Sequence, residues 1–199
     1  MQSKLADAKQ TFLAGKFEEA ITAFRSVLDE QPACTEAFLG LGFALHADGR
    51  ATEAIEVFQA GLNRCPNHPE LHFGYGLALM TISDEYRAVR EFKRTLELEP
   101  AHKLCPALLK KALRIHTDHL LEEGNFIWAE QMIEDQLALD EHSPDALAQM
   151  IKLKNKLSEY DEAKRLFRIL NEKKPDYPGI YDLAKVLGIM KHRERGWLY

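Results

Sequence analysis

The sequence contains no apolar run of the roughly 20 residues that a membrane-spanning helix needs. Its first seven residues contain no apolar core and already include an acidic residue, so we expect no secretory signal there. It has three cysteines, Cys34, Cys65 and Cys105, without any CxxC spacing. We therefore expect neither a disulfide framework nor a zinc site, and reduced cysteines are typical of a cytoplasmic protein.

An excess of basic residues is also missing, because 26 Lys and Arg stand against 31 Asp and Glu, for a net charge of −5. Nucleic-acid binding depends largely on clustered Lys and Arg that neutralise phosphates, so nucleic acid is not an expected partner. An RNA-binding helical repeat, whose period is nearly the same, is the alternative that a filter-binding test with single-stranded RNA would decide.

Motifs of catalysis and metal binding are absent from the sequence as well. It has no P-loop, GxSxG, dinucleotide or HExxH motif. His68 and His72 are four residues apart and His116 and His119 three apart, but a zinc site needs three or four ligands. We therefore expect a protein that is not an enzyme and that uses no cofactor and no metal.

A repeat of 34 residues is the dominant feature of the sequence. Five columns keep this spacing over three copies, which is hard to obtain by chance. The columns are Ala20, Ala54 and Ala88; Phe24, Phe58 and Phe92; Pro32, Pro66 and Pro100; Gly15, Gly49 and Ser83; and Ala8, Gly42 and Gly76.

The columns predict a helix–turn–helix unit. Leu41, Gly42 and Leu45 share one helical face, where the glycine lets a neighbouring helix approach closely. Gly49 then supplies the backbone freedom for a turn, and Pro66 ends the second helix, because proline cannot continue one.

These residues resemble the tetratricopeptide repeat, in which glycine, alanine, phenylalanine and proline recur at this spacing. Residues 1–34, 35–68 and 69–102 are clear copies. A fourth copy, around Ala129, begins after seven additional residues that we place within 101–110. The fifth copy returns to register, since Ala163 follows Ala129 by 34 residues.

The resemblance implies an all-α fold: one right-handed superhelical solenoid over residues 1–199, with about five repeats. The fourth and fifth repeats are expected at 110–143 and 144–177. A capping helix at 178–193 would cover the last apolar face. Residues 194–199 form an apolar tail, which either folds back on the last helices or enters the groove of a second copy, so that the protein self-associates.

The resemblance also implies a concave groove, lined by the first helix of each repeat, that holds a partner protein or peptide. Its positions are mostly apolar in the first three repeats and mostly charged or polar in the last two. In the first three they are Leu5, Lys9, Phe12, Leu39, Phe43, His46, Phe73, Leu77 and Met80. In the last two they are Lys111, Arg114, Asp118, Leu121, Lys152, Asn155 and Lys156.

Two alternatives concern these groove positions. Phe43 and Phe73 could pack against neighbouring helices, since an aromatic residue at helical spacing usually belongs to a core. Lys152 and Lys156 could pair with acids of a ligand or simply form a solvated face.

The expected function is that of a protein-binding scaffold or adaptor without catalysis. The alternative is a chaperone-like or regulatory module, by itself or as part of a larger protein, that shields an apolar client segment. An assay of aggregation suppression separates the two functions. One subfamily holds the terminal carboxylate of a heat-shock chaperone with Lys and Asn side chains. The matching positions here are Leu5, Lys9, Gly40, Glu70 and Gly74, so that ligand is not expected.

Overall fold

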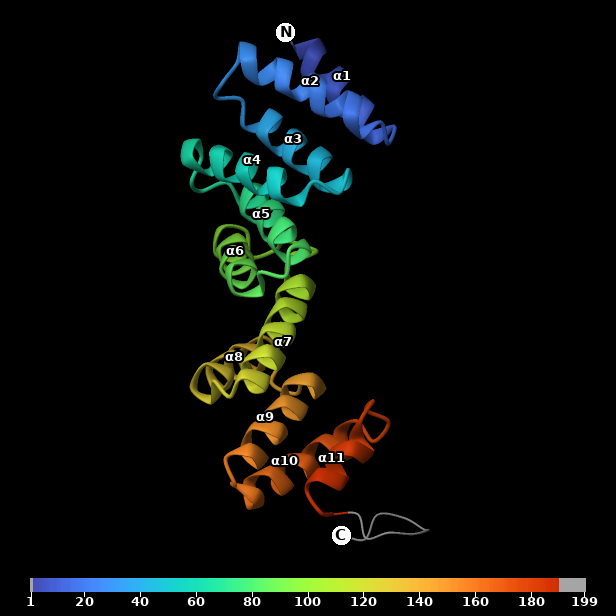
Figure 1. Ribbon diagram of the computed structural model, residues 1–199, viewed down its shortest axis with the longest axis vertical. Coiled ribbons are helices and arrows are strands. Elements are labelled where there is room, and N and C mark those ends of the chain that lie inside the picture. The colour runs from blue at the N-terminus through green and yellow to red at the C-terminus, as the bar shows by residue number, and fades with distance from the viewer. Residues whose placement is uncertain (1, 190–199) are drawn as a thin grey trace. The chain divides into compact units, whose positions relative to one another are not determined.

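The computed structural model describes residues 2–189, and in this range the chain forms eleven α-helices and no β-strand (Figure 1). The predicted tail, 194–199, lies outside the described residues. In chain order the helices are α1 (Gln2–Leu13), α2 (Phe17–Glu30), α3 (Thr35–Ala47), α4 (Ala51–Arg64), α5 (Pro69–Thr81), α6 (Glu85–Leu98), α7 (Cys105–Glu123), α8 (Phe126–Leu139), α9 (Pro144–Lys156), α10 (Tyr160–Lys173) and α11 (Ile180–Val186).

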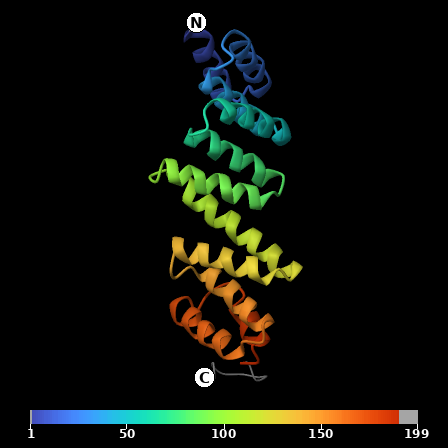
Figure 2. The same cartoon turned by 90° about the vertical axis from the view of Figure 1, so that its left-hand side faces the viewer.

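The chain divides into two compact units, Met1–Ala112 and Leu113–Tyr199. The first contains α1 to α6 with the beginning of α7, and the second contains the rest of α7 with α8 to α11. Within each unit, consecutive helices pair through short turns, which Figure 2 shows from a second direction. The predicted all-helical repeat fold is confirmed.

The turn inside each helix pair holds one residue with a positive φ. These residues are Gly15 (75°), Gly49 (83°), Ser83 (58°), Gly124 (76°) and Ser158 (63°). Glycine adopts this left-handed conformation without steric cost, whereas serine is strained there. Ser83 therefore stands in the glycine column because the turn, not the residue type, dictates the backbone.

Phe24, Phe58 and Phe92 form the centre of the first unit, and each is at most 1% exposed. A Cβ atom on Gly42 would lie 2.5 Å from the Phe58 ring, and so would one on Gly74 from the next pair. The Phe58 ring therefore packs closely against the glycines of two helices, α3 and α5. Close packing of this kind explains why the glycines sit inside helices that they weaken by about 1 kcal/mol each.

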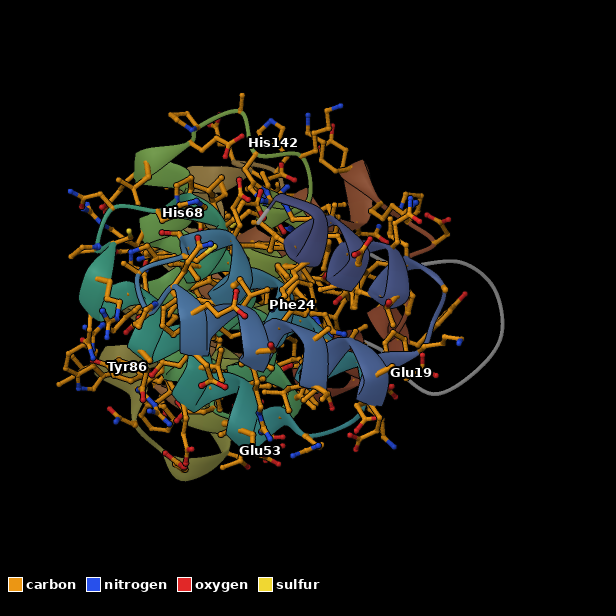
Figure 3. All side chains as sticks on the ribbon, turned by 90° about the horizontal axis from the view of Figure 1, so that it is seen from above. Glu19, Phe24, Glu53, His68, Tyr86 and His142 are labelled. Atoms are coloured by element: carbon orange, nitrogen blue, oxygen red, sulfur yellow. The ribbon has the colours of Figure 1, made fainter. Side chains whose placement is uncertain are left out.

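Polar residues lie at the margin of the first unit. Seen from the N-terminal end, Figure 3 shows Phe24 inside, with Glu19, Glu53 and Tyr86 at the periphery. Arg50, which precedes α4, joins two helix pairs there, since it contacts Glu53 on α4 at 2.6 Å and Glu18 on α2 at 3.1 Å.

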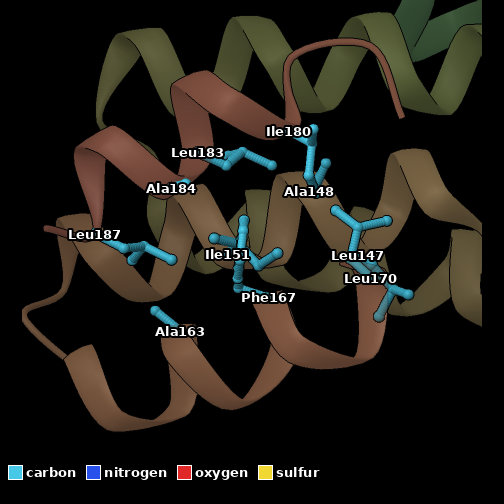
Figure 4. Close-up of a cluster of buried hydrophobic side chains, with 10 residues drawn as sticks. All are labelled: Leu147, Ala148, Ile151, Ala163, Phe167, Leu170, Ile180, Leu183, Ala184 and Leu187. Carbon is cyan, nitrogen blue, oxygen red and sulfur yellow. The ribbon is translucent and has the colours of Figure 1, made fainter. Parts of the chain in front are cut away.

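The second unit has its own apolar cluster, which α9, α10 and α11 build together (Figure 4). Ile151 and Phe167 lie at its centre and are each 1% exposed. Its members are Leu147, Ala148, Ile151, Ala163, Phe167, Leu170, Ile180, Leu183, Ala184 and Leu187.

The additional residues of the fourth repeat lie where the sequence predicts them. Helix α7 has 19 residues, whereas α3 and α5 have 13 each. The segment before α7 is also longer, spanning residues 99–104 where residues 31–34 and 65–68 precede α3 and α5. Helix α11 is shorter than expected, because it ends at Val186 rather than near 193. Among the described helices, none is long and apolar enough to cross a membrane.

Candidate functional site

The apolar side chains of the predicted groove in the first unit are mostly half-buried. Leu5 and Phe12 lie on α1, Leu39 and Phe43 on α3, and Leu77 with Met80 on α5. Their own repeats leave part of each side chain accessible, and Leu13, the neighbour of Phe12, is 81% exposed. We name Leu5, Phe12, Leu39, Phe43, Leu77 and Met80 the apolar face.

The two aromatic residues of the predicted groove differ in their environment. Phe43 is half-buried and meets the edge of the Phe58 ring, with centroids 5.4 Å apart. Phe73 is only 5% exposed, because the rings of Phe92 and His102 cover it at 6.1 and 4.4 Å. The packing alternative therefore holds for Phe73, which offers little surface to a partner.

One polar pair borders the apolar face. His46 Nε2 and Thr81 Oγ1 lie 2.9 Å apart and join α3 to α5. Burial lowers the pKa of His46, so the imidazole is neutral at pH 7. A neutral ring keeps this region free of positive charge, which suits an apolar ligand.

The positions that would hold a terminal carboxylate have other structural roles here. A Cβ atom on Gly40 would lie 2.2 Å from the Phe24 ring, and one on Gly74 would lie 2.5 Å from the Phe58 ring. Lys9 is paired with Glu36 at 3.2 Å, and Glu70 lies 3.3 Å from His102. These four residues therefore take part in contacts within the chain.

The predicted groove residues of the second unit are polar or charged. Lys152 and Lys156 on α9 are exposed, Asn155 is half-buried, and Arg114 on α7 pairs with Asp118 at 3.5 Å. Lys111 is exposed but belongs to the first unit, and Leu121 is buried. Within residues 2–189, the structure records no ion pair for Lys152 or Lys156.

A buried amide network supports the arrangement of α7, α8 and α9. The Gln136 amide donates to Thr117 Oγ1 at 3.0 Å and to Gln149 Oε1 at 2.8 Å. The Gln149 amide in turn donates to the Arg114 carbonyl at 2.8 Å and to Asp118 at 2.9 Å. The network holds Arg114 and Asp118 in place, because their helix is tied to the next two.

Sequence reasoning missed this network, although a signal for it exists. Thr117 stands in the column of Gly42 and Gly76, and Gln149 in the column of Gly40 and Gly74. Polar side chains at positions that hold glycine in the second and third repeats indicate a partner inside the core, because buried polar groups are nearly always hydrogen-bonded.

Cys105 and His102 are both buried and pack inside the first unit. Cys105 is fully buried, and burial raises its pKa to about 11, so the unreactive thiol form predominates. Its backbone N–H donates to His102 Nδ1 at 3.1 Å. Within residues 2–189, no three His, Cys, Asp or Glu side chains are grouped to hold a metal ion.

Comparison with known proteins gives one family model and several solved structures of the same fold. Residues 13–69 match the sequence model of the tetratricopeptide repeat. No curated protein sequence matches the chain.

Among solved structures, YrrB, a protein of this repeat with an unusual peptide-binding site, superposes with a TM-score of 0.64 at 16% identity. The match covers 92% of this chain and 90% of YrrB. The first such domain of Spaghetti (RPAP3), bound to an HSP90 peptide, gives 0.55 at 19% identity over 56% of this chain and 88% of that one.

The type III secretion chaperone SycD of Yersinia enterocolitica, in complex with a peptide of the translocator YopD, gives a TM-score of 0.53 at 21% identity. This match covers 56% of the present chain and 90% of SycD. Identities at this level show a shared fold. Residues 13–69 therefore match the tetratricopeptide repeat in sequence, and the chain shares the fold of solved proteins built from this repeat.

Proposed function

We propose that this chain is a non-enzymatic protein-interaction module that binds an apolar peptide or helix of a partner on the apolar face of its first unit. The observation that carries the proposal is the half-exposure of six large apolar side chains on the first helices of three successive repeats. Large apolar side chains that folding leaves partly accessible on successive repeats are typical of an interaction site.

The chemistry of the face favours an apolar ligand over an acidic one. Lys9 is neutralised by Glu36, and the pKa of His46 is lowered by burial, so neither offers an unpaired cation. An amphipathic helix would place apolar residues at i, i+3 and i+4 into such a surface. The peptide complexes of the RPAP3 domain and of SycD support peptide binding as a function of this fold.

The direct test is affinity capture from native lysate with wild type and a Leu39→Glu, Leu77→Glu double variant. Both leucines are half-buried, so each substitution puts charge on the face rather than into the core. Phe73 is unsuitable for this purpose, because a charge at this buried position would disrupt packing. Tyr86→Glu, an exposed aromatic on the second helix α6, is the matched control.

A partner captured by wild type and by the Tyr86→Glu control should be absent with the double variant. Circular dichroism must show that all three proteins have the same helix content. Capture of the same partner by the folded double variant would reject the apolar face as the binding surface.

A second candidate function is that of a chaperone which shields an apolar client segment. The apolar character of the face and the likeness to the secretion chaperone SycD favour it. The two functions differ in their effect on a client. A chaperone should suppress aggregation of the captured segment at equimolar concentration, whereas a scaffold should leave its solubility unchanged.

A further inference from the structure

A long stretch of the second unit carries negative charge alone. Between Arg114 and Lys152 the sequence has no Lys or Arg, and helix α8 lies in the middle of this stretch. The acidic residues in it are Asp118, Glu122, Glu123, Glu130, Glu134, Asp135, Asp140, Glu141 and Asp145. Glu130 is paired with Lys154 of α9 and Asp118 with Arg114, whereas Glu122, Glu123, Glu134 and Glu141 are exposed and give the surface around α8 its negative charge.

Two large apolar side chains stand exposed in this acidic surface. Ile127 is 84% exposed and Trp128 is 55% exposed, and Gln131 and Glu134 on the same side of the helix are exposed as well. We call these four residues the α8 outer face. Spacings of four and seven residues from Ile127 place Gln131 and Glu134 along one line of the helix.

The repeat itself does not need these apolar residues. The column of Trp128 holds Glu19, Glu53, Arg87 and Glu162 in the other repeats, all of them charged. Repeat packing at this position thus works with a polar side chain. An exposed Trp beside an exposed Ile in such a column points to a contact outside the unit, because Trp is enriched where proteins bind one another.

The chemistry of the surface defines its occupant. An acidic surface with an apolar centre is complementary to a basic segment that carries aromatic residues. Residues 190–199, which lie outside the described residues, have this composition: Lys191, Arg193 and Arg195 are followed by Trp197, Leu198 and Tyr199. They contain one acidic residue, Glu194.

We propose that residues 190–199 of a second copy of this chain bind the α8 outer face, with the aromatic residues against Ile127 and Trp128 and the cations among the surrounding carboxylates. A second copy is favoured over the same chain by the packing of the second unit. Helix α11 packs against α9 and α10, and the α8 outer face points away from its neighbour α9. Because α11 packs against α9 and α10, we assign the contact to the tail of another copy.

The test uses a fluorescent peptide of residues 190–199 and the chain shortened to residues 1–189. Anisotropy should show saturable binding that weakens as salt rises, because exposed charges are screened. Ile127→Glu and Trp128→Ala should each weaken binding by roughly tenfold or more. Tyr86→Glu in the first unit should leave it unchanged, and a peptide of the same composition in scrambled order should bind less.

The full chain supplies the second readout. Sedimentation should show a concentration-dependent dimer or larger assembly for wild type and a monomer for both the shortened chain and Trp128→Ala. Three outcomes overturn the proposal. They are no binding of the peptide, binding that neither α8 variant affects, and a full chain that stays monomeric at concentrations above the peptide dissociation constant. If Ile127→Glu fails to fold, Trp128→Ala alone tests whether the peptide binds the α8 outer face.

Discussion

Ser83 and Ser158 occupy left-handed turn positions that glycine fills in the other repeats. An L-residue in this conformation costs roughly 1–2 kcal/mol. Replacing it with glycine removes this cost, but part of the stabilisation is lost because glycine gives the unfolded chain more entropy. We expect Ser83→Gly and Ser158→Gly each to raise the free energy of unfolding by about 0.5–1 kcal/mol in urea titrations. Ser26→Gly, at an exposed position inside α2, is the control and should lower the free energy of unfolding by a similar amount.

At Gly74 the limit is space rather than backbone conformation. A methyl group there would lie 2.5 Å from Phe58, so Gly74→Ala should lower the free energy of unfolding by about 1–3 kcal/mol. Phe58→Leu makes room in the same place. In a double-mutant cycle, Gly74→Ala should cost clearly less in the Phe58→Leu background than in wild type; equal costs would mean that the ring is not the obstacle.

Pairs of helices are the next scale, where His72 on α5 joins Glu91 on α6 at 2.7 Å. Burial alone would lower the pKa of His72, but the hydrogen bond to Glu91, the Pro66 carbonyl and the Glu91 charge together raise it. The stabilisation is therefore present in full below the unfolded pKa of about 6.5 and is lost as pH rises through the folded pKa.

The free energy of unfolding of wild type minus that of His72→Gln should accordingly fall as pH rises above neutrality. His46→Gln is the matched control of opposite sign, because burial lowers the pKa of His46, so its difference should fall as pH drops below about 6.5. Denaturant titrations at a series of pH values below and above neutrality measure both differences in the free energy of unfolding. A His72 difference that does not change with pH would contradict the role of the ion pair.

The amide network between α7, α8 and α9 makes a further prediction for these elements. Gln149→Leu should lower the free energy of unfolding by about 1–3 kcal/mol, because it leaves the buried Gln136 amide and the Arg114 carbonyl without their partner. Adding Gln136→Leu should cost less in that variant than in wild type. Additive losses in thermal or urea unfolding would show that the two amides act independently.

How far the sequence predicts this structure also depends on the scale. Columns of Ala, Phe and Gly sufficed for the helix pairs and for the burial of Phe58, because a repeat imposes the same environment at each copy. The column could not predict that Phe73 is covered, since His102 reaches it from the irregular segment before α7. It could not place Gln136 beside Gln149 either, because that contact depends on the register between two helices. The short α11 has no counterpart in the other repeats, so their lengths gave no guide to it.

At the scale of the whole molecule, the two units present different surfaces. The first offers an apolar face on α1, α3 and α5, whereas the second combines exposed lysines on α9 with the acidic surroundings of α8. We propose that the first unit binds the partner and that the second unit makes the contact between copies. Changes confined to one unit should therefore leave the other activity intact.

Isothermal titration calorimetry with the purified captured segment decides whether the apolar face binds the partner. Wild type and Tyr86→Glu should bind with equal affinity and with a negative heat-capacity change, the sign of apolar burial. The folded Leu39→Glu, Leu77→Glu variant should bind roughly tenfold more weakly or not at all. Equal affinity of that variant and wild type would contradict the account.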